Sequence, residues 1–312
     1  MPDIVITEFI DLEPVERLKL HYDVHLDEDL WQKPDELKDL THNAKALIVR
    51  NRTQVTEAIL NAGPGLKAIG RLGVGLDNID VAACEKRGIA VLPAFGVNAR
   101  SVAEYVLATA LVLLRGSAYL GSERLAAGKW PRAEMGQGRE AETRIMGLIG
   151  FGSIGRVTAG LARAAGFTTI AFDAQREVGE TVAGTDLVDL TTLLSRADVV
   201  TLHCPLTAET RNLIAAKELS AMKPGAILIN TARGGIVDER ALADALRSGH
   251  LGGAAVDVFV TEPITSDAGE LFKGLPNVIL TPHIAGITVE SNARTSAVTV
   301  DNVLRALGKE TE

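Results

Sequence analysis

The segment Ile145-Met146-Gly147-Leu148-Ile149-Gly150-Phe151-Gly152-Ser153-Ile154-Gly155 joins an apolar stretch to a glycine-rich turn. Its first five residues have the composition of a buried strand, and the residues after the turn favour a helix. In such a unit Gly150 permits the tight turn, Gly152 lets a pyrophosphate approach the backbone, and Gly155 lets the helix pack on the strand. Because a helix N-terminus also offers amide hydrogens, the pattern predicts a dinucleotide site.

A carboxylate stands where such a site needs one. The next strand candidate, Thr168–Phe172, ends in Asp173, which is 18 residues after Gly155. A carboxylate at this distance can accept hydrogen bonds from the adenosine ribose and repels the 2′-phosphate of NADP. We therefore expect NAD as the cofactor. Arg176 leaves NADP open, because a guanidinium near the ribose can host a 2′-phosphate.

Strand-like and helix-like stretches alternate along the chain, which is typical of α/β domains with parallel sheets. A helix is expected over Ser101–Leu114, with Ser101 as its N-cap and Glu104 completing a capping box. The pattern restarts after the polar connection 128–142, so we expect two doubly wound units. The remaining elements expected are strands over Ile4–Thr7, Ala46–Arg50, Leu66–Gly70, Ile89–Leu92, Val199–His203, Ala226–Asn230, Ala254–Val258 and Val278–Leu280, and a last helix over Val289–Leu307.

Composition excludes several classes of protein. The 312 residues are 46% hydrophobic and 23% charged, which is typical of a globular protein, and the formal net charge of −8 argues against nucleic acid or an anionic membrane as a partner. The longest apolar stretch, Tyr105–Leu114, is about half of a membrane span. Two cysteines, Cys84 and Cys204, indicate neither a disulfide framework nor a cysteine metal site. We expect a reduced, cytoplasmic protein without a bound metal.

Three polar segments follow later strand candidates: 230–235 (NTARGG), 257–263 (DVFVTEP) and 281–286 (TPHIAG). Taken singly, Arg233 could be a surface charge, Glu262 a turn cap and His283 an ordinary loop histidine. Together they fit the interconversion of a 2-keto acid and a 2-hydroxy acid.

Each of the three side chains has a role in that reaction. Arg233 can bind the carboxylate and polarise the carbonyl group. His283 can exchange a proton with the carbonyl oxygen, and Glu262 can hold the imidazole and favour its charged form. The hydride comes from the nicotinamide, so neither a metal nor a protein nucleophile is required.

With these motifs the sequence resembles the D-isomer-specific 2-hydroxyacid dehydrogenases, from Arg50 to Gly286. Within that family it is most similar to short 3-phosphoglycerate dehydrogenases and to sulfolactate dehydrogenases. The motifs that carry the resemblance are 73–80 (GVGLDNID), Asn98 with 101–104 (SVAE), the glycine-rich turn, His203-Cys204-Pro205 and the three polar segments.

The resemblance implies a flavodoxin-like substrate domain, residues 1–98 plus 288–312, into which a Rossmann NAD-binding domain, residues 99–287, is inserted. It also implies a homodimer formed through 101–144. Arg233, Glu262 and His283 would be the catalytic triad, and the backbone at Val74 and Gly75 would face the substrate carboxylate and the nicotinamide. The cofactor contacts that it implies are Gly150, Gly152, Ser153, Ile154, Gly155, Asp173, Cys204, Thr231, Asp257 and Gly286, with Asp257 at the nicotinamide amide.

Two arginines bear on the choice of substrate. Arg50 and Arg71 each stand at the end of a strand candidate and could be surface charges. They match arginines that face the substrate phosphate in 3-phosphoglycerate dehydrogenases. We therefore expect a substrate with an anion at each end, either 3-phosphoglycerate or sulfolactate, with malate-like acids as a third choice.

Other functions share this fold. The alternatives are a glyoxylate/hydroxypyruvate-type reductase and a non-catalytic, NAD-sensing corepressor, which keeps much of the triad. A formate dehydrogenase has glutamine in place of the acid–base carboxylate, so Glu262 argues against it. Turnover of 2-keto acids that is lost in His283→Ala would distinguish an enzyme from a sensor.

Overall fold

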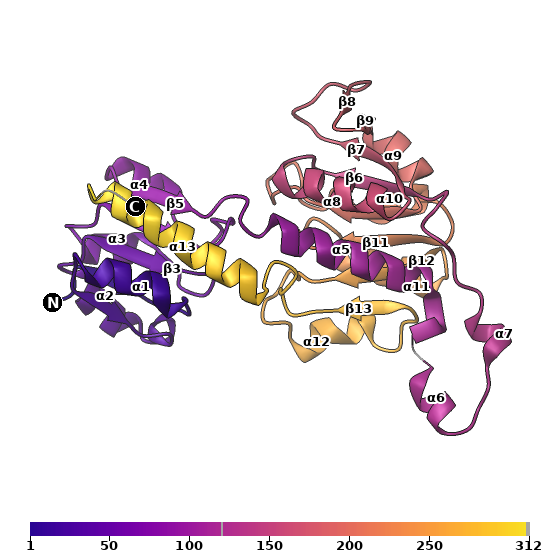
Figure 1. Ribbon diagram of the computed structural model, residues 1–312, viewed down its shortest axis with the longest axis horizontal. Coiled ribbons are helices and arrows are strands. Elements are labelled where there is room, and N and C mark those ends of the chain that lie inside the picture. Colours follow the sequence, from indigo (N-terminus) through magenta and orange to yellow (C-terminus); the bar gives the residue numbers. More distant parts are fainter. Residues whose placement is uncertain (120, 310–312) are drawn as a thin grey trace. The chain divides into compact units, whose positions relative to one another are not determined.

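The computed structural model describes residues 1–119 and 121–309. The chain folds into two compact units. Unit 1 contains Met1–Asn98 and the C-terminal segment from Ile287, and unit 2 contains Ala99–Gly286. Each unit is built around its own sheet (Figure 1).

Unit 1 has a five-stranded sheet in the order β2-β1-β3-β4-β5, the flavodoxin-like order, and every strand pair in it is parallel. The strands are β1 (Ile4–Ile6), β2 (Val24–Leu26), β3 (Ala46–Val49), β4 (Ala68–Arg71) and β5 (Ala90–Pro93). The helices are α1 (Leu12–Lys19), η1 (Leu30–Gln32), α2 (Pro34–Thr41), α3 (Glu57–Ala62), α4 (Val81–Lys86) and α13 (Val289–Ala306).

The sheet of unit 1 is buried on both faces, because alternate residues of each strand point to opposite sides. Ile4 and Ile6 pack with α1 and with Val300 and Val303 of α13, whereas Val5 faces the layer formed by α2, α3 and α4. Figure 1 shows α13, in yellow, lying across the sheet beside α1. The C-terminal helix thus completes the fold of the N-terminal segment.

Unit 2 has an eight-stranded sheet in the order β13-β12-β11-β10-β6-β7-β9-β8, in which only the β8–β9 pair is antiparallel. Its strands are β6 (Ile145–Ile149), β7 (Thr168–Phe172), β8 (Thr181–Val182), β9 (Thr185–Leu187), β10 (Val199–Leu202), β11 (Ala226–Asn230), β12 (Leu251–Val256) and β13 (Val278–Leu280). Its helices are α5 (Ala99–Leu114), η2 (Gly116–Tyr119), α6 (Ser122–Ala126), α7 (Arg132–Met135), α8 (Ser153–Ala164), α9 (Leu190–Arg196), α10 (Ala216–Ala221), α11 (Glu239–Arg247), α12 (Ser266–Gly269) and η3 (Glu270–Phe272).

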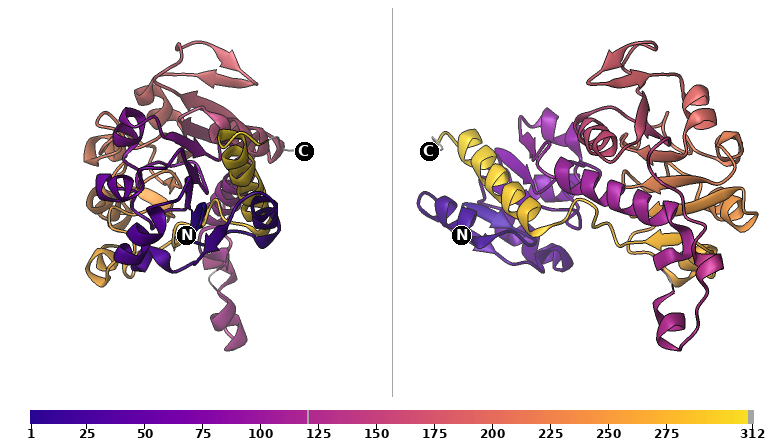
Figure 2. Two further views of the ribbon diagram at one scale, coloured as in Figure 1. Left: turned by 90° about the vertical axis from the view of Figure 1, so that its left-hand side faces the viewer. Right: turned by 45° about the vertical axis from the view of Figure 1, so that its right-hand side comes forward.

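Helices cover both faces of this sheet. The helices α9, α10 and α11 enclose one apolar core, and α5 packs with α8 on the other face (Figure 2). The strand order reverses at β6, which pairs with β7 on one side and with β10 on the other. In doubly wound sheets a ligand binds outside the carboxyl ends of the strands at such a point. The glycine-rich turn directly follows β6 and therefore lies at that edge.

The predicted fold class, two doubly wound α/β units with parallel sheets, is confirmed, and four strands (β6, β7, β11 and β13) have the predicted bounds. The predicted N-cap at Ser101 is wrong. The helix α5 begins at Ala99, so Ser101 lies inside it, and Glu104 forms an ion pair with Arg100 instead of closing a capping box. The short strands β2, β8 and β9 were not predicted, because none of them has a continuous apolar run.

Within the described residues, no helix combines the length and the apolar character that crossing a membrane would require.

Candidate active site

The glycine-rich turn has a backbone that only glycine adopts easily. Gly150 has a φ of +92°, and a Cβ there would lie 2.8 Å from the amide nitrogen of Cys204. A Cβ on Gly155 would overlap the carbonyl oxygen of Gly150, so this glycine lets α8 pack against the turn. The turn therefore holds β6, α8 and the segment after β10 close together.

The N-terminus of α8 is open on its outer side. A Cβ added to Gly152, the residue before the helix, would meet no atom within 4 Å. The helix begins at Ser153 and Ile154, and its first amide hydrogens have no partner inside the helix. This open cradle fits the pyrophosphate of a dinucleotide, as the sequence predicts.

Asp173 lies beside the same turn. Its Oδ2 accepts a hydrogen bond from the amide of Phe151 at 2.7 Å, and its Oδ1 accepts one from the amide of Gln175 at 2.9 Å. Each carboxylate oxygen can accept more than one hydrogen bond, so both can also receive ribose hydroxyls. Asp173 thus joins the end of β7 to the glycine turn.

Two further predicted cofactor contacts follow β10 and β11. The Oγ1 atom of Thr231 is buried without a hydrogen-bond partner, which is a costly state that a polar ligand would relieve. Burial raises the pKa of the Cys204 thiol to about 11, so this side chain is a neutral thiol at physiological pH. The open cradle, the carboxylate and the unpaired hydroxyl all fit a bound NAD.

His283 and Glu262 are paired. Nδ1 of His283 lies 2.7 Å from Oε2 of Glu262, and Oε1 of Glu262 accepts a hydrogen bond from the amide of Phe259 at 2.9 Å. Burial pushes the pKa of Glu262 upward, but these two hydrogen bonds and the charge of Arg233 outweigh burial and lower the pKa. Glu262 is therefore a carboxylate at neutral pH. Because a carboxylate only accepts, Nδ1 carries a proton and Nε2 is left to exchange one with a substrate.

The backbone around His283 is held by Asp257. His283 has a φ of +57°, uncommon for a residue with a side chain, and its amide donates to the carbonyl of Asp257 at 2.8 Å. The Asp257 side chain is 1% exposed, and its carboxylate accepts the amides of Ile284 and Ala285, both at 2.8 Å. Asp257, which the resemblance placed at the nicotinamide amide, is thus already bonded to the loop 281–286 that carries His283, the histidine loop.

Tyr105 and Thr281 extend this network and were missed in the sequence. The Thr281 hydroxyl donates to Oδ1 of Asp257 at 2.6 Å, and the Tyr105 hydroxyl lies 2.6 Å from the same threonine oxygen. Since Thr281 has a single proton, Tyr105 must be the donor to Thr281. Burial raises the pKa of Tyr105 and outweighs the hydrogen bond with Thr281, which lowers it, so Tyr105 is an uncharged phenol at neutral pH. This chain of hydrogen bonds connects α5 to Asp257 and the histidine loop.

Arg233 lies on the turn after β11. Its carbonyl oxygen accepts a hydrogen bond from the side-chain amide of Asn230 at 3.1 Å, and its Nη1 donates to the carbonyl of Ala232 at 2.6 Å. A Cβ on Gly234 would overlap the carbonyl of Phe259, so this turn packs directly on the loop that carries Glu262. The adjacent strands β11, β12 and β13 thereby bring the three triad residues to one edge of the sheet. Gly286 ends this edge and is the last residue of unit 2.

The two arginines of unit 1 differ from each other. Arg71 is 9% exposed, and its Nε donates to the carbonyl of Gly75 at 2.8 Å, so it supports the turn that contains Val74. Arg50 is half-buried, its Nη2 donates to Oδ1 of Asn292 at 2.8 Å, and its guanidinium lies 5.8 Å from the centre of the Phe9 ring. Burial lowers the pKa of Arg50, and no carboxylate among the described residues comes within 4.0 Å of it. Such a cation favours an anionic ligand.

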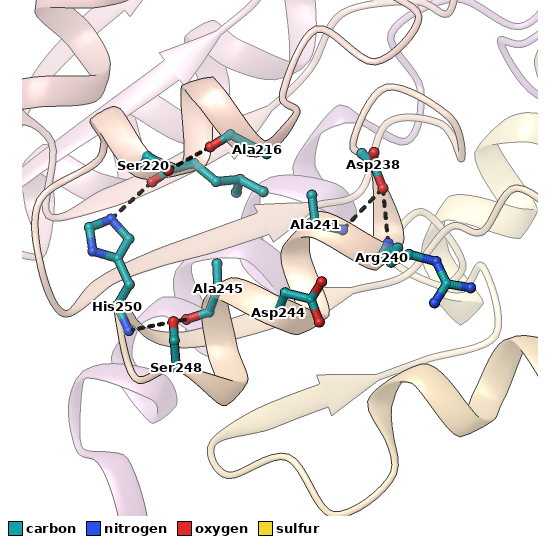
Figure 3. A pocket seen from close by; sticks show the side chains of 10 residues that line it. Ala216, Ser220, Asp238, Arg240, Ala241, Asp244, Ala245, Ser248 and His250 are labelled. Carbon is teal, nitrogen blue, oxygen red and sulfur yellow. Dashed lines mark hydrogen bonds between the residues drawn. The ribbon is translucent and has the colours of Figure 1, made fainter.

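A pocket of about 390 Å³ lies elsewhere in unit 2, between α10 and α11 (Figure 3). Acidic and basic side chains line it in similar number, and Asp238 already caps α11 through the amides of Arg240 and Ala241. None of the predicted site residues lines this pocket, so it adds nothing to the candidate active site.

Comparisons with known proteins identify the family of this chain. Residues 107–285 match the family model described as D-isomer specific 2-hydroxyacid dehydrogenase, NAD binding domain. The chain belongs to this family. The (S)-sulfolactate dehydrogenase of Chromohalobacter salexigens is 50% identical over 312 residues, 99% of each chain. The D-3-phosphoglycerate dehydrogenase of Synechocystis is 38% identical over 97% of this chain, which spans 54% of that protein.

A solved structure extends the likeness to the whole fold. The D-lactate dehydrogenase of Aquifex aeolicus, complexed with NAD and lactic acid, superposes with a TM-score of 0.82 at 30% identity, covering 97% of this chain and 95% of that one. The predicted family and the predicted cofactor are confirmed. This 2-hydroxyacid dehydrogenase is an oxidoreductase that uses NAD.

Proposed function

We propose that this dehydrogenase acts on a 2-hydroxy acid with a second anionic group, and that this acid is (S)-sulfolactate. The observation that carries the proposal is Arg50, a half-buried guanidinium without a carboxylate partner among the described residues. A sulfonate would give it strong charge-assisted hydrogen bonds. The 50% identity to a sulfolactate dehydrogenase along the full chain supports the sulfonate over a phosphate.

The roles of the triad follow from its hydrogen bonds. In the reducing direction Arg233 binds the carboxylate of the keto acid and polarises its carbonyl group. His283 donates the proton on Nε2 to the carbonyl oxygen, while Glu262 holds Nδ1 and stabilises the positive charge of the ring. In the oxidising direction Nε2 takes the proton back. When bound, NAD accepts or returns the hydride.

The cofactor contacts are part of the same proposal. The pyrophosphate lies on the N-terminus of α8, at Gly152, Ser153 and Ile154, and Asp173 binds the adenosine ribose. Thr231 offers its unpaired hydroxyl, and Cys204 lines the site as a neutral thiol. Asp257 supports the nicotinamide side through the histidine loop. Unit 2 is thus the NAD-binding domain, and unit 1 is the substrate domain.

We also propose a homodimer and a cytoplasmic location. The helices α6 and α7 lie on a loop that extends away from the sheet of unit 2 in Figures 1 and 2. This segment exposes large apolar side chains, with Trp130 77% and Leu125 44% exposed. Exposed apolar groups on a projecting segment favour an interface with a second copy. Both cysteines are free thiols, as expected of a cytoplasmic protein.

The test is steady-state kinetics of NADH oxidation with sulfopyruvate, phosphohydroxypyruvate, hydroxypyruvate, glyoxylate, oxaloacetate and pyruvate. We expect the highest kcat/KM with sulfopyruvate. Arg50→Ala should lower kcat/KM for the keto acids with a second anion by about 10- to 100-fold, the value of one to two charge-assisted hydrogen bonds, and should affect pyruvate far less.

Arg52→Ala is the matched control. Arg52 lies in the same loop as Arg50, but its guanidinium lies 4.9 Å from the centre of the Trp31 ring. Equal losses for all keto acids in Arg50→Ala would remove Arg50 from substrate recognition. A higher kcat/KM with phosphohydroxypyruvate than with sulfopyruvate would show that the second anionic group is a phosphate and not a sulfonate.

A further inference from the structure

Glu8 is a buried carboxylate that accepts hydrogen bonds from a single loop. The residue is 4% exposed. Oε1 accepts the amides of Arg50 at 2.9 Å and Thr53 at 3.0 Å, and also the Thr53 hydroxyl at 2.8 Å. Oε2 accepts the amide of Arg52 at 3.0 Å. The backbone N–H groups of Arg50, Arg52 and Thr53 therefore all point to a single side chain.

The strand register explains this contact. β1 and β3 are adjacent and parallel, and Ile6 pairs with Ile48. The ladder continues one step further, because the amide of Thr7 donates to the carbonyl of Ile48 at 3.1 Å. Two residues beyond the paired isoleucines, the two strands deliver Glu8 and Arg50 side by side. The contact thus depends on a pairing of segments that are distant in the sequence.

The opposite side of the loop is also held. The side-chain amide of Asn78 donates to the carbonyl of Arg50 at 3.2 Å and to the carbonyl of Thr53 at 2.7 Å. Glu8 thus binds the amides of the loop and Asn78 binds its carbonyls. The backbone of Arg50 is fixed before its guanidinium meets Asn292 and the ring of Phe9. Groups that orient a binding side chain in this way determine how well it binds.

We propose that Glu8 is a positioning residue that sets the anion specificity of the enzyme, because it fixes the loop from which Arg50 reaches the second anionic group of the substrate. The inference rests on the proposed function, since it requires Arg50 to bind that group. Glu8 does not contact the substrate itself. It acts through the backbone of 50–53.

Charge and geometry give opposite expectations for this residue, which makes the inference easy to test. A carboxylate near an anion site weakens anion binding by repulsion, so loss of its charge alone would lower the KM for a keto acid with a second anion. Loss of the hydrogen bonds by which Glu8 fixes the loop would raise that KM. In Glu8→Gln the shape is kept, but one oxygen becomes an NH₂ group, which cannot accept a hydrogen bond from the loop. Positioning therefore predicts a higher KM.

The experiment compares Glu8→Gln with the unaltered enzyme on sulfopyruvate and on the best monoanionic keto acid. We expect the KM for sulfopyruvate to rise at least tenfold, with kcat and the Kd for NADH within about threefold. The KM for the monoanionic acid should change much less. Asp3→Asn is the matched control, because Asp3 pairs with Lys45 in the same unit and removal of its charge leaves the loop untouched.

The other outcomes are equally informative. A lower KM for sulfopyruvate, or equal increases for both substrates, would overturn the inference. Thr53→Val removes one of the four hydrogen bonds and should give a smaller selective increase, so the inference stays testable if Glu8→Gln fails to fold. If Arg50→Ala abolishes the preference for sulfopyruvate and neither Glu8→Gln nor Thr53→Val weakens it, the inference fails and the proposed function stands. If the unaltered enzyme has no preference for a second anion, the proposed function fails.

Discussion

Nδ1 of His283 lies 2.7 Å from Oε2 of Glu262, and this pairing leaves Nε2 as the ring nitrogen that can exchange a proton with a ligand. The pKa of Glu262 is below its ordinary value of 4.5, because the hydrogen bonds from His283 and Phe259 outweigh the effect of burial. The carboxylate is therefore ionised throughout the range in which a histidine titrates. A change of rate in that range therefore does not come from the protonation of Glu262.

The first prediction concerns that pH dependence. The kcat/KM for reduction should fall as the pH rises and His283 loses its proton, whereas the kcat/KM for oxidation should rise. Glu262→Gln should move both profiles toward lower pH, because the charged ring loses its anionic partner. His283→Ala should lower kcat by about 10²- to 10⁴-fold and leave the Kd for NADH unchanged. Identical profiles for Glu262→Gln and the unaltered enzyme would contradict the role of Glu262.

The second prediction concerns the hydroxyl chain from α5 to the histidine loop. Thr281→Val removes the donor to Asp257 and should lower kcat by about tenfold, because His283 then loses part of the support for its left-handed backbone. Tyr105→Phe removes only the outer hydroxyl and should cost less. Thr109→Val is the control, since that hydroxyl bonds only to carbonyls of α5. A loss in Thr109→Val equal to that in Thr281→Val would indicate a general effect on α5.

The elements that carry their own signal could be predicted from the sequence. β6 and its turn combine an apolar run with three glycines, and each of these features is local. β12 begins three residues before its prediction, because Gly252 and Gly253 weaken the strand pattern. Gly253 is needed there, since a Cβ would come within 2.8 Å of the carbonyl of Asn277. The need for glycine at this position comes from a neighbouring segment, so the sequence of the strand alone does not reveal it.

The same limit applies to the site. Glu8 follows a strand without any motif, and its partners are 42 to 45 residues away, so only the register of β1 and β3 identifies it. Arg50 and Arg71 looked equivalent in the sequence. The structure separates them, because Arg71 bonds to the backbone of its own turn and Arg50 has no carboxylate partner among the described residues.

The third prediction concerns thiol reactivity. Burial raises the pKa of Cys204 to about 11 and also raises that of Cys84. At pH 8 only about one Cys204 in a thousand is then a thiolate, the form that reacts with disulfide reagents. The native enzyme should therefore react slowly with Ellman's reagent, and both thiols should react rapidly after unfolding. If one thiol per chain reacts rapidly in the native protein, that thiol is accessible and ionised, which would contradict the prediction.

The fourth prediction concerns assembly. If α6 and α7 form the interface of a homodimer, Trp130→Glu should shift the molar mass measured by light scattering from two chains toward one, because it places a charge in an apolar contact. Val178→Glu is a suitable control, since Val178 is 64% exposed outside that segment. A dimer that persists in Trp130→Glu at low protein concentration would place the interface elsewhere.

The last prediction concerns the choice of cofactor. If Asp173 binds the ribose hydroxyls and repels a 2′-phosphate, Asp173→Asn should raise the KM for NADH by about tenfold and narrow the preference for NADH over NADPH. The amide of Phe151 bonds to Oδ2 of Asp173, and an asparagine can keep that contact through its carbonyl oxygen, so the glycine turn should stay in place. Arg176→Ala distinguishes the two charges: it should leave NADH unaffected and reduce whatever activity Asp173→Asn gains with NADPH. If Asp173→Asn weakens both cofactors equally, Asp173 supports the turn and does not select the ribose.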